Sequence, residues 1–96
     1  MVTDFETIRA SLEYCKDELK KLKIKLLYTI NEDEVIMKLC ASQIDNTPFK
    51  NFEMHLAFSN DVFGRYSKDE ILNYIYQFFI NEVEEIKSFS NEVNND

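Results

Sequence analysis

The side chains that most often perform chemistry are sparse in this chain. It has one histidine, His55, and two cysteines, Cys15 and Cys40, among 96 residues. A nucleophilic cysteine needs a base beside it, and Cys40 and His55 fall on neighbouring predicted strands without a third group or an oxyanion loop. The sequence therefore predicts no catalytic residue and no enzyme activity. Both cysteines are interpreted as buried free thiols.

Carboxylates are abundant, but their spacing does not match a metal site. Glu32, Asp33 and Glu34 fall in a turn, where successive side chains point apart, and other acids lie near the end of a predicted helix. The chain has no EF-hand pattern, no Cys-x-x-Cys pair and a single glycine, which excludes phosphate loops that need several. We therefore expect no metal ion and no cofactor.

Charge is distributed unevenly along the chain. Residues 16–25 hold five of the eleven basic side chains, although the formal net charge is −7. In residues 26–96, thirteen acidic residues stand against five basic ones, a net of −8. A small domain that concentrates negative charge in this way fits a positively charged partner. Lys16, Lys20 and Lys23 would share one helical flank, where pairing with acids one turn earlier explains them.

Two segments have the periodicity of amphipathic helices. Apolar residues recur at spacings of three and four near the start of the chain and again in its last third, which predicts helices over residues 4–22 and 68–87. Each helix follows a capping box, in which a hydroxyl and a carboxylate satisfy the first free amides. The polar residues 88–96 are expected to form a frayed tail. The capping-box pairs are Thr3 with Glu6 and Ser67 with Glu70.

Between the helices the apolar period changes to two, which predicts three strands over residues 23–30, 35–44 and 51–59. Their short connections favour an antiparallel meander. Residues 1–96 are thus expected to form a single two-layer α+β domain in the order α-β-β-β-α, with both helices on one face of the sheet.

The face of the predicted sheet that the helices leave open is more apolar than a solvated face should be. A homodimer or a docked partner would cover it, although sheet twist and long lysine stems are an alternative cover. The second helix offers a further apolar surface. The candidate interface residues are Leu27, Ile36, Cys40 and Ala57 on the sheet, and Tyr74, Tyr76 and Ile80 on the helix.

The element order is similar to that of the double-stranded RNA-binding domain. That family holds phosphates with a lysine cluster at the start of its last helix. Here the corresponding residues 67–70 read Ser-Lys-Asp-Glu, one lysine against two acids, and the net charge opposes phosphate binding. The resemblance therefore covers element order alone, and we expect no direct contact with nucleic acid.

Two functions remain as hypotheses. The first is a non-enzymatic inhibitor that covers a basic, nucleic-acid-binding surface of a nuclease or defence effector. In size, charge and element order the chain resembles phage anti-CRISPR and other anti-defence proteins, and acidic proteins that confer immunity to nucleases. The alternative is a small acidic oligomeric chaperone or accessory subunit that binds through apolar surface. The candidate partner-binding acids are Glu32, Asp33, Glu34, Asp45, Asp61, Glu82, Glu84 and Glu85.

The sequence also carries expectations about origin and location. Lysine outnumbers arginine nine to two, a bias typical of AT-rich bacterial genomes and their phages. The first residues have neither the basic nor the apolar region of a signal peptide, and no apolar stretch approaches a membrane span. We therefore expect a cytoplasmic protein without a membrane partner.

Overall fold

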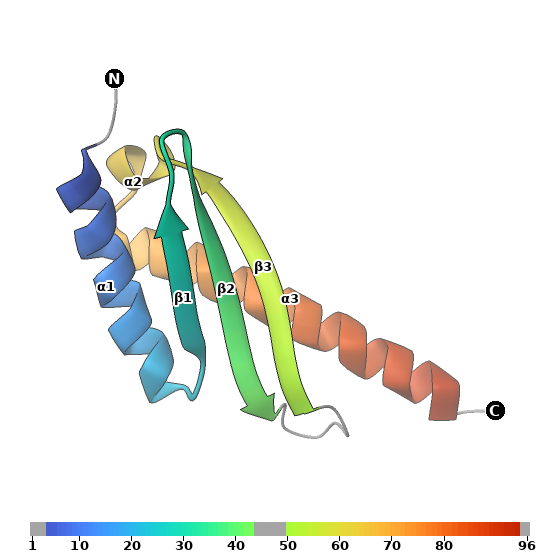
Figure 1. The fold of residues 1–96 in the computed structure, drawn as a ribbon. Helices are drawn as coiled ribbons and strands as arrows, with labels where there is room; N and C mark the ends of the chain where they lie inside the picture. Colours follow the sequence, from blue (N-terminus) through green and yellow to red (C-terminus); the bar gives the residue numbers. More distant parts are fainter. Residues whose placement is uncertain (1–3, 44–49, 95–96) are drawn as a thin grey trace.

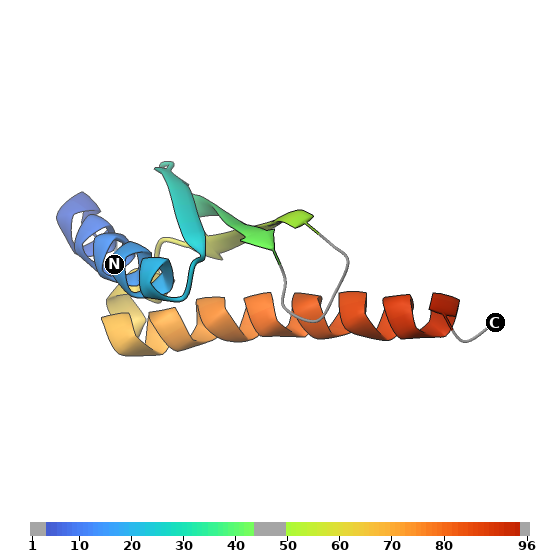
Figure 2. The same cartoon turned by 90° about the horizontal axis from the view of Figure 1, so that it is seen from below.

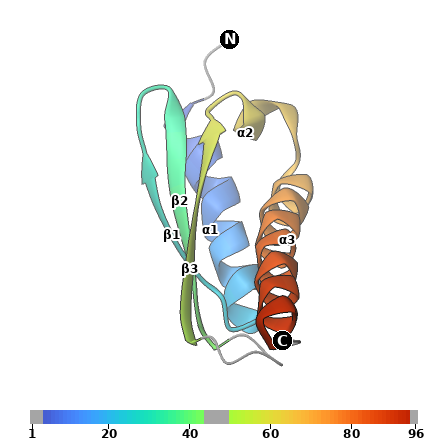
Figure 3. The same cartoon turned by 90° about the vertical axis from the view of Figure 1, so that its right-hand side faces the viewer.

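The structure, a computed structural model, describes residues 4–43 and 50–94 as a three-stranded sheet with helices on one side (Figure 1). The strands are antiparallel in the order β1-β2-β3. Viewed toward the edge of the sheet, both long helices lie against the same face (Figure 3). The predicted α+β class and α-β-β-β-α order are confirmed, with one short helix added. The elements are α1 (Phe5–Lys21), β1 (Lys25–Ile30), β2 (Glu34–Gln43), β3 (Lys50–Ser59), α2 (Val62–Arg65) and α3 (Lys68–Asn94).

Helix α1 begins one residue later than the predicted capping box implies. Asp4 is the N-cap, and its carboxylate accepts a hydrogen bond from the Thr7 amide at 2.8 Å. This hydrogen bond lowers the pKa of Asp4, because it stabilises the charged form. An aspartate at this position reaches the third helical amide directly, so Glu6 is not needed as the reciprocal cap. Thr3 lies outside the described residues.

Helix α1 ends in a Schellman motif, which corrects the predicted start of the first strand from residue 23 to residue 25. The Ile24 amide donates to the Leu19 carbonyl and the Lys23 amide donates to the Lys20 carbonyl, both at 3.0 Å. The residue at the turn, Lys23, has a φ of 65°, where glycine is the usual residue. Ile24 and Leu19 are both buried beneath this turn.

Replacing the lysine at this turn is expected to stabilise the fold. Lys23→Gly removes the clash of a Cβ with the left-handed backbone, so the free energy of unfolding should rise by about 0.5–1 kcal/mol after the greater entropy of unfolded glycine is subtracted. Urea unfolding measures this change. Lys16→Gly, at an exposed position inside α1, is the matched control and should lose about 1 kcal/mol. A loss of stability in Lys23→Gly would show that the lysine side chain contributes to the fold.

Alternate residues of the strands face the helices, as the sequence predicts. Val35, Met37, Leu39 and Ala41 of β2 are all buried, because β2 is the central strand. The neighbours of these residues on the edge strands are buried or half-buried. The inward-facing ladders are Leu26–Leu39–Met54, Tyr28–Met37–Leu56 and Ile30–Val35–Phe58.

Helix α2 lies between the third predicted strand and the second predicted helix, in residues for which the periodicity predicts no element. It has four residues, and its Phe63 is buried with the ring centroid 6.3 Å from that of Phe58 on β3. The α2 segment therefore closes one end of the core. Two adjacent apolar side chains, Val62 and Phe63, give too short a pattern to predict a helix.

Helix α3 begins at Lys68 as predicted, and its capping box is confirmed. The Glu70 amide donates to Ser67 Oγ at 3.2 Å, and the Ser67 amide donates to Glu70 Oε1 at 3.1 Å. Its buried stripe consists of Ile71, Ile75, Phe79 and Val83, and the Phe79 ring meets Phe52 of β3 edge to face at 5.5 Å. These contacts fix α3 beneath β3.

The far end of α3 differs from the prediction. The helix continues to Asn94, seven residues beyond the expected end, so residues 88–94 are helical and not a frayed tail. No glycine or proline interrupts this stretch, and polar residues continue a helix at little cost. The last turns extend past the sheet (Figure 2), which gives the molecule its longest dimension of 53 Å.

Candidate functional site

The structure gathers four of the predicted acidic residues at one end of the sheet. Glu32 and Asp33 lie in the β1–β2 turn, Glu34 is the first residue of β2, and Asp61 follows β3. Glu34 pairs with Ser59 across the sheet, which places the end of β3 beside the turn. We call Glu32, Asp33, Glu34 and Asp61 the acidic end.

A buried asparagine ties the two segments of the acidic end together. The Asn60 side-chain amide donates to the Asn31 carbonyl at 3.1 Å and to the Glu32 carbonyl at 2.8 Å. Its backbone amide donates to the Asp33 carbonyl at 3.1 Å. Three hydrogen bonds from one residue hold the turn in place, although nothing in the sequence around Asn60 indicates that it is buried.

The carboxylates of the acidic end have no partners among the side chains that the structure describes. All four residues are exposed, and none of them takes part in an ion pair or a side-chain hydrogen bond there. Asp61 is the N-cap residue of α2, but its side chain makes no capping hydrogen bond. Since the described part of the chain gives these charges no partner, they remain available to an external group.

The other predicted acids lie elsewhere. Glu82, Glu84 and Glu85 are exposed on the second half of α3, which runs away from the β1–β2 turn (Figure 1). Glu84 forms an ion pair with Lys87 at 4.0 Å. Asp45 lies outside the described residues. The predicted set of eight acids is therefore not one surface.

The open face of the sheet mixes apolar and charged side chains. Leu27 and Ile36 are each 41% exposed, and Ile36 pairs with Ala57. Lys38 is half-buried and forms an ion pair of 3.3 Å with Glu53, which pairs with Cys40 in the ladder. The lysine stem and its ion pair cover part of this face, as the alternative interpretation of the sequence allowed.

The apolar residues expected to share a surface on α3 separate into two groups. Tyr74 is 40% exposed and its ring meets that of Tyr66 edge to face at 5.3 Å. Tyr76 is half-buried and lines a hollow of about 340 Å³ together with Leu22, the C-cap residue of α1. Ile80 is half-buried and packs against the core. Two residues apart on a helix, Tyr74 and Tyr76 point to opposite sides.

An exposed aromatic surface extends from Tyr74, a predicted interface residue, to residues that the sequence did not single out. Phe78 is 45% exposed, one helical turn beyond Tyr74, and its ring lies 6.1 Å from that of Phe58. We call Tyr66, Tyr74 and Phe78 the aromatic ridge. The spacing of four between Tyr74 and Phe78 was the available signal, but the many apolar residues of α3 concealed which of them face outward.

The groups considered for catalysis do not converge. His55 is exposed on β3 opposite Lys38, and Cys40 pairs with Glu53, so the histidine and cysteine are diagonal neighbours on adjacent strands. Burial, with the Asp69 charge nearby, raises the pKa of Cys15 to about 12, which keeps that thiol protonated at neutral pH. Among the described residues, no three metal-binding side chains come together.

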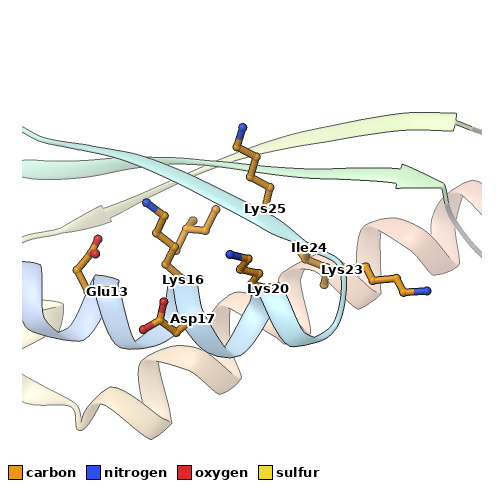
Figure 4. Close-up of a pocket in the computed structure, with 8 residues that line it drawn as sticks. Glu13, Lys16, Asp17, Lys20, Lys23, Ile24 and Lys25 are labelled. Atoms are coloured by element: carbon orange, nitrogen blue, oxygen red, sulfur yellow. The ribbon is translucent and has the colours of Figure 1, made fainter.

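A pocket lined by lysines lies at the other end of the sheet. It has a volume of about 520 Å³ between the last turns of α1 and the start of β1 (Figure 4). The interpretation of Lys16, Lys20 and Lys23 as partners of helical acids is wrong for the described side chains. Within residues 16–25 the ion pair described is that of Lys21 with Glu18, at 3.1 Å. We call Lys16, Lys20, Lys23 and Lys25 the lysine pocket.

Comparisons of the chain with models of known families, with curated proteins and with solved structures found no match. Within the described residues, no helix combines the length and the apolar character needed to cross a membrane. The function therefore has to be argued from the surfaces of this molecule.

Proposed function

We propose that this protein binds a partner protein through the acidic end and covers a positively charged surface of it. The observation that carries the proposal is the set of hydrogen bonds from Asn60, which joins the β1–β2 turn to the segment after β3 and so holds their exposed carboxylates at one end of the sheet. A rigid group of like charges loses little conformational entropy on binding. No reaction is required of such a protein, since it acts by occupying the partner's surface.

The partner surface that best complements the acidic end is the nucleic-acid-binding surface of a nuclease or defence effector. Such surfaces concentrate lysine and arginine to neutralise phosphates, and carboxylates on a turn can occupy the same positions. Complementary charge also accelerates association. A protein of this kind inhibits its target by reaching the basic surface before nucleic acid does.

The proposal predicts that charge at the acidic end controls partner binding. The variant Glu32→Gln/Asp33→Asn/Glu34→Gln keeps the shape of the turn but removes three charges. Proteins captured from a host lysate by the unchanged chain should be lost by this variant. The association rate with a captured protein, measured by surface plasmon resonance at low salt, should fall at least about tenfold.

A control variant with the same net charge distinguishes binding through the acidic end from an effect of the overall negative charge. Glu82→Gln/Glu84→Gln/Glu85→Gln removes three charges from α3, so both variants change the net charge from −7 to −4. The control should retain the same captured proteins with nearly the same rate. Equal losses in both variants would contradict the proposal, and so would an unchanged rate in the variant of the acidic end.

The aromatic ridge favours a second candidate function, an accessory or chaperone-like module that binds through apolar surface. Tyr66, Tyr74 and Phe78 are large and exposed side by side, and aromatic anchors often dominate binding energy. Salt distinguishes the two functions. Binding through the acidic end weakens as salt shortens the range of charge, whereas binding through the ridge should change little.

A further inference from the structure

The lysine pocket is a partly open hollow lined by positive charge that forms no ion pair among the described side chains. Its walls come from one face of α1 and from the first residues of β1, and Ile24 and Leu26 supply its apolar part. The volume of about 520 Å³ lies within the range of about 300–1,000 Å³ for small-molecule sites. The pocket is separate from the acidic end, since β1 runs between them (Figure 1).

The electrostatics of the pocket favour an anion. Four lysines and two acids line it, an excess of two positive charges in a protein of net charge −7. Glu13 already accepts a hydrogen bond from the Tyr28 hydroxyl. In Figure 4 the ammonium groups of Lys16 and Lys20 extend toward β1, whereas the Asp17 carboxylate does not.

The end of α1 does not oppose an anion as a bare helix C-terminus would. Carbonyl groups at such an end carry partial negative charge. Here the Leu19 and Lys20 carbonyls accept hydrogen bonds from the amides of residues 22–24. The same Schellman turn places Lys23 at the rim of the pocket, in the left-handed conformation that glycine would adopt more easily.

We propose that the lysine pocket binds a phosphorylated small molecule of nucleotide size. Its phosphates lie between Lys16 and Lys20, which are one helical turn apart and act as point charges toward phosphate oxygens. Lys23 and Lys25, whose side chains extend outward in Figure 4, turn inward to complete the charge balance. The uncharged part of the ligand lies against Ile24, Leu26 and the lysine stems.

Titration of the full chain with ATP, pyrophosphate and adenosine, followed by the backbone amide signals in NMR spectra, tests the proposal. ATP and pyrophosphate should both shift the signals of residues 13–26, with ATP binding more tightly, and adenosine should leave them unchanged. If adenosine bound as tightly as ATP, the proposal that the pocket recognises phosphate would be wrong. If the shifted signals were centred outside residues 13–26, the proposed location of the site would be wrong. Tighter binding of a short single-stranded oligonucleotide than of ATP would mean that the ligand is nucleic acid and not a small molecule.

A pair of charge-matched variants completes the test. Lys16→Gln/Lys20→Gln should weaken ATP binding at least about tenfold, because it removes the hydrogen bonds from both ammonium groups to phosphate, and hydrogen bonds between charged groups contribute more than neutral ones. Lys21→Gln/Lys87→Gln removes the same charge outside the pocket and should retain the affinity. Glutamine preserves helix propensity, and circular dichroism verifies the fold. Equal weakening in the two variants would reduce the effect to net charge and overturn the proposal.

Discussion

Phe79→Ala should lose about 3–5 kcal/mol of the free energy of unfolding, the largest effect expected for a single substitution in α3. The Phe79 side chain is only 7% exposed and its ring meets Phe52 of β3 edge to face. Truncation removes this contact and leaves a cavity between α3 and the sheet. For a domain of this size, thermal unfolding should begin more than about 12 °C lower, which differential scanning calorimetry measures.

The neighbouring phenylalanine is the matched control. Phe78 is 45% exposed, so Phe78→Ala should cost less than about 1 kcal/mol while removing part of the aromatic ridge. Similar losses in the two variants would mean that Phe78 is buried as deeply as Phe79 and that α3 turns a different face toward the sheet. Loss of partner binding in Phe78→Ala, with stability retained, would favour the second candidate function.

Asn60→Ala should have the next largest effect, a loss of about 2 kcal/mol. The Asn60 amide makes two side-chain hydrogen bonds to the β1–β2 turn, each worth about 0.5–1.5 kcal/mol net. Without them the Asn31 and Glu32 carbonyls lose their partners and the turn separates from β3. Urea unfolding gives the loss of stability, and faster hydrogen exchange at residues 31–34 would locate it.

Asn73→Ala provides the control for the asparagine tie. Asn73 is exposed on α3, where alanine is the better helix former, so its replacement should leave stability unchanged or slightly raised. If Asn60→Ala behaves in the same way, the tie does not hold the acidic end. Association with a basic partner should also slow in Asn60→Ala under conditions where the variant remains folded, because its carboxylates are no longer held together.

The helices and strands of this fold were predicted well where the signal lies within the element itself, as a regular spacing of apolar residues or a contact between near neighbours. The alternation of Val35, Met37, Leu39 and Ala41 identifies a strand with one buried face, and the Ser67–Glu70 capping box is a contact between near neighbours. Predictions failed at boundaries. Lys23 adopts a conformation that lysine seldom takes, so the turn after α1 carried no glycine to mark it. Residues 88–94 are mostly polar but contain no glycine or proline that would stop a helix.

The candidate site was predicted less well, because it depends on contacts between distant residues. The sequence indicated that Glu32, Asp33 and Glu34 lie in a turn, but Asn60 joins that turn to Asp61 across 28 residues of chain. The lysines of α1 were attributed to ion pairs with helical acids, since spacing alone permits them. Side-chain positions decide whether such pairs form, and here they do not for Lys16, Lys20 and Lys23 among the described side chains.

The acidic end and the lysine pocket lie at opposite ends of β1, and this placement has a consequence for how the molecule moves. Separated charges of opposite sign give the domain an electric dipole moment along the strand. The field of a positively charged partner attracts one end and repels the other, so it exerts a torque as well as a pull. The domain therefore turns as it approaches, and a larger share of encounters begin with the acidic end in front.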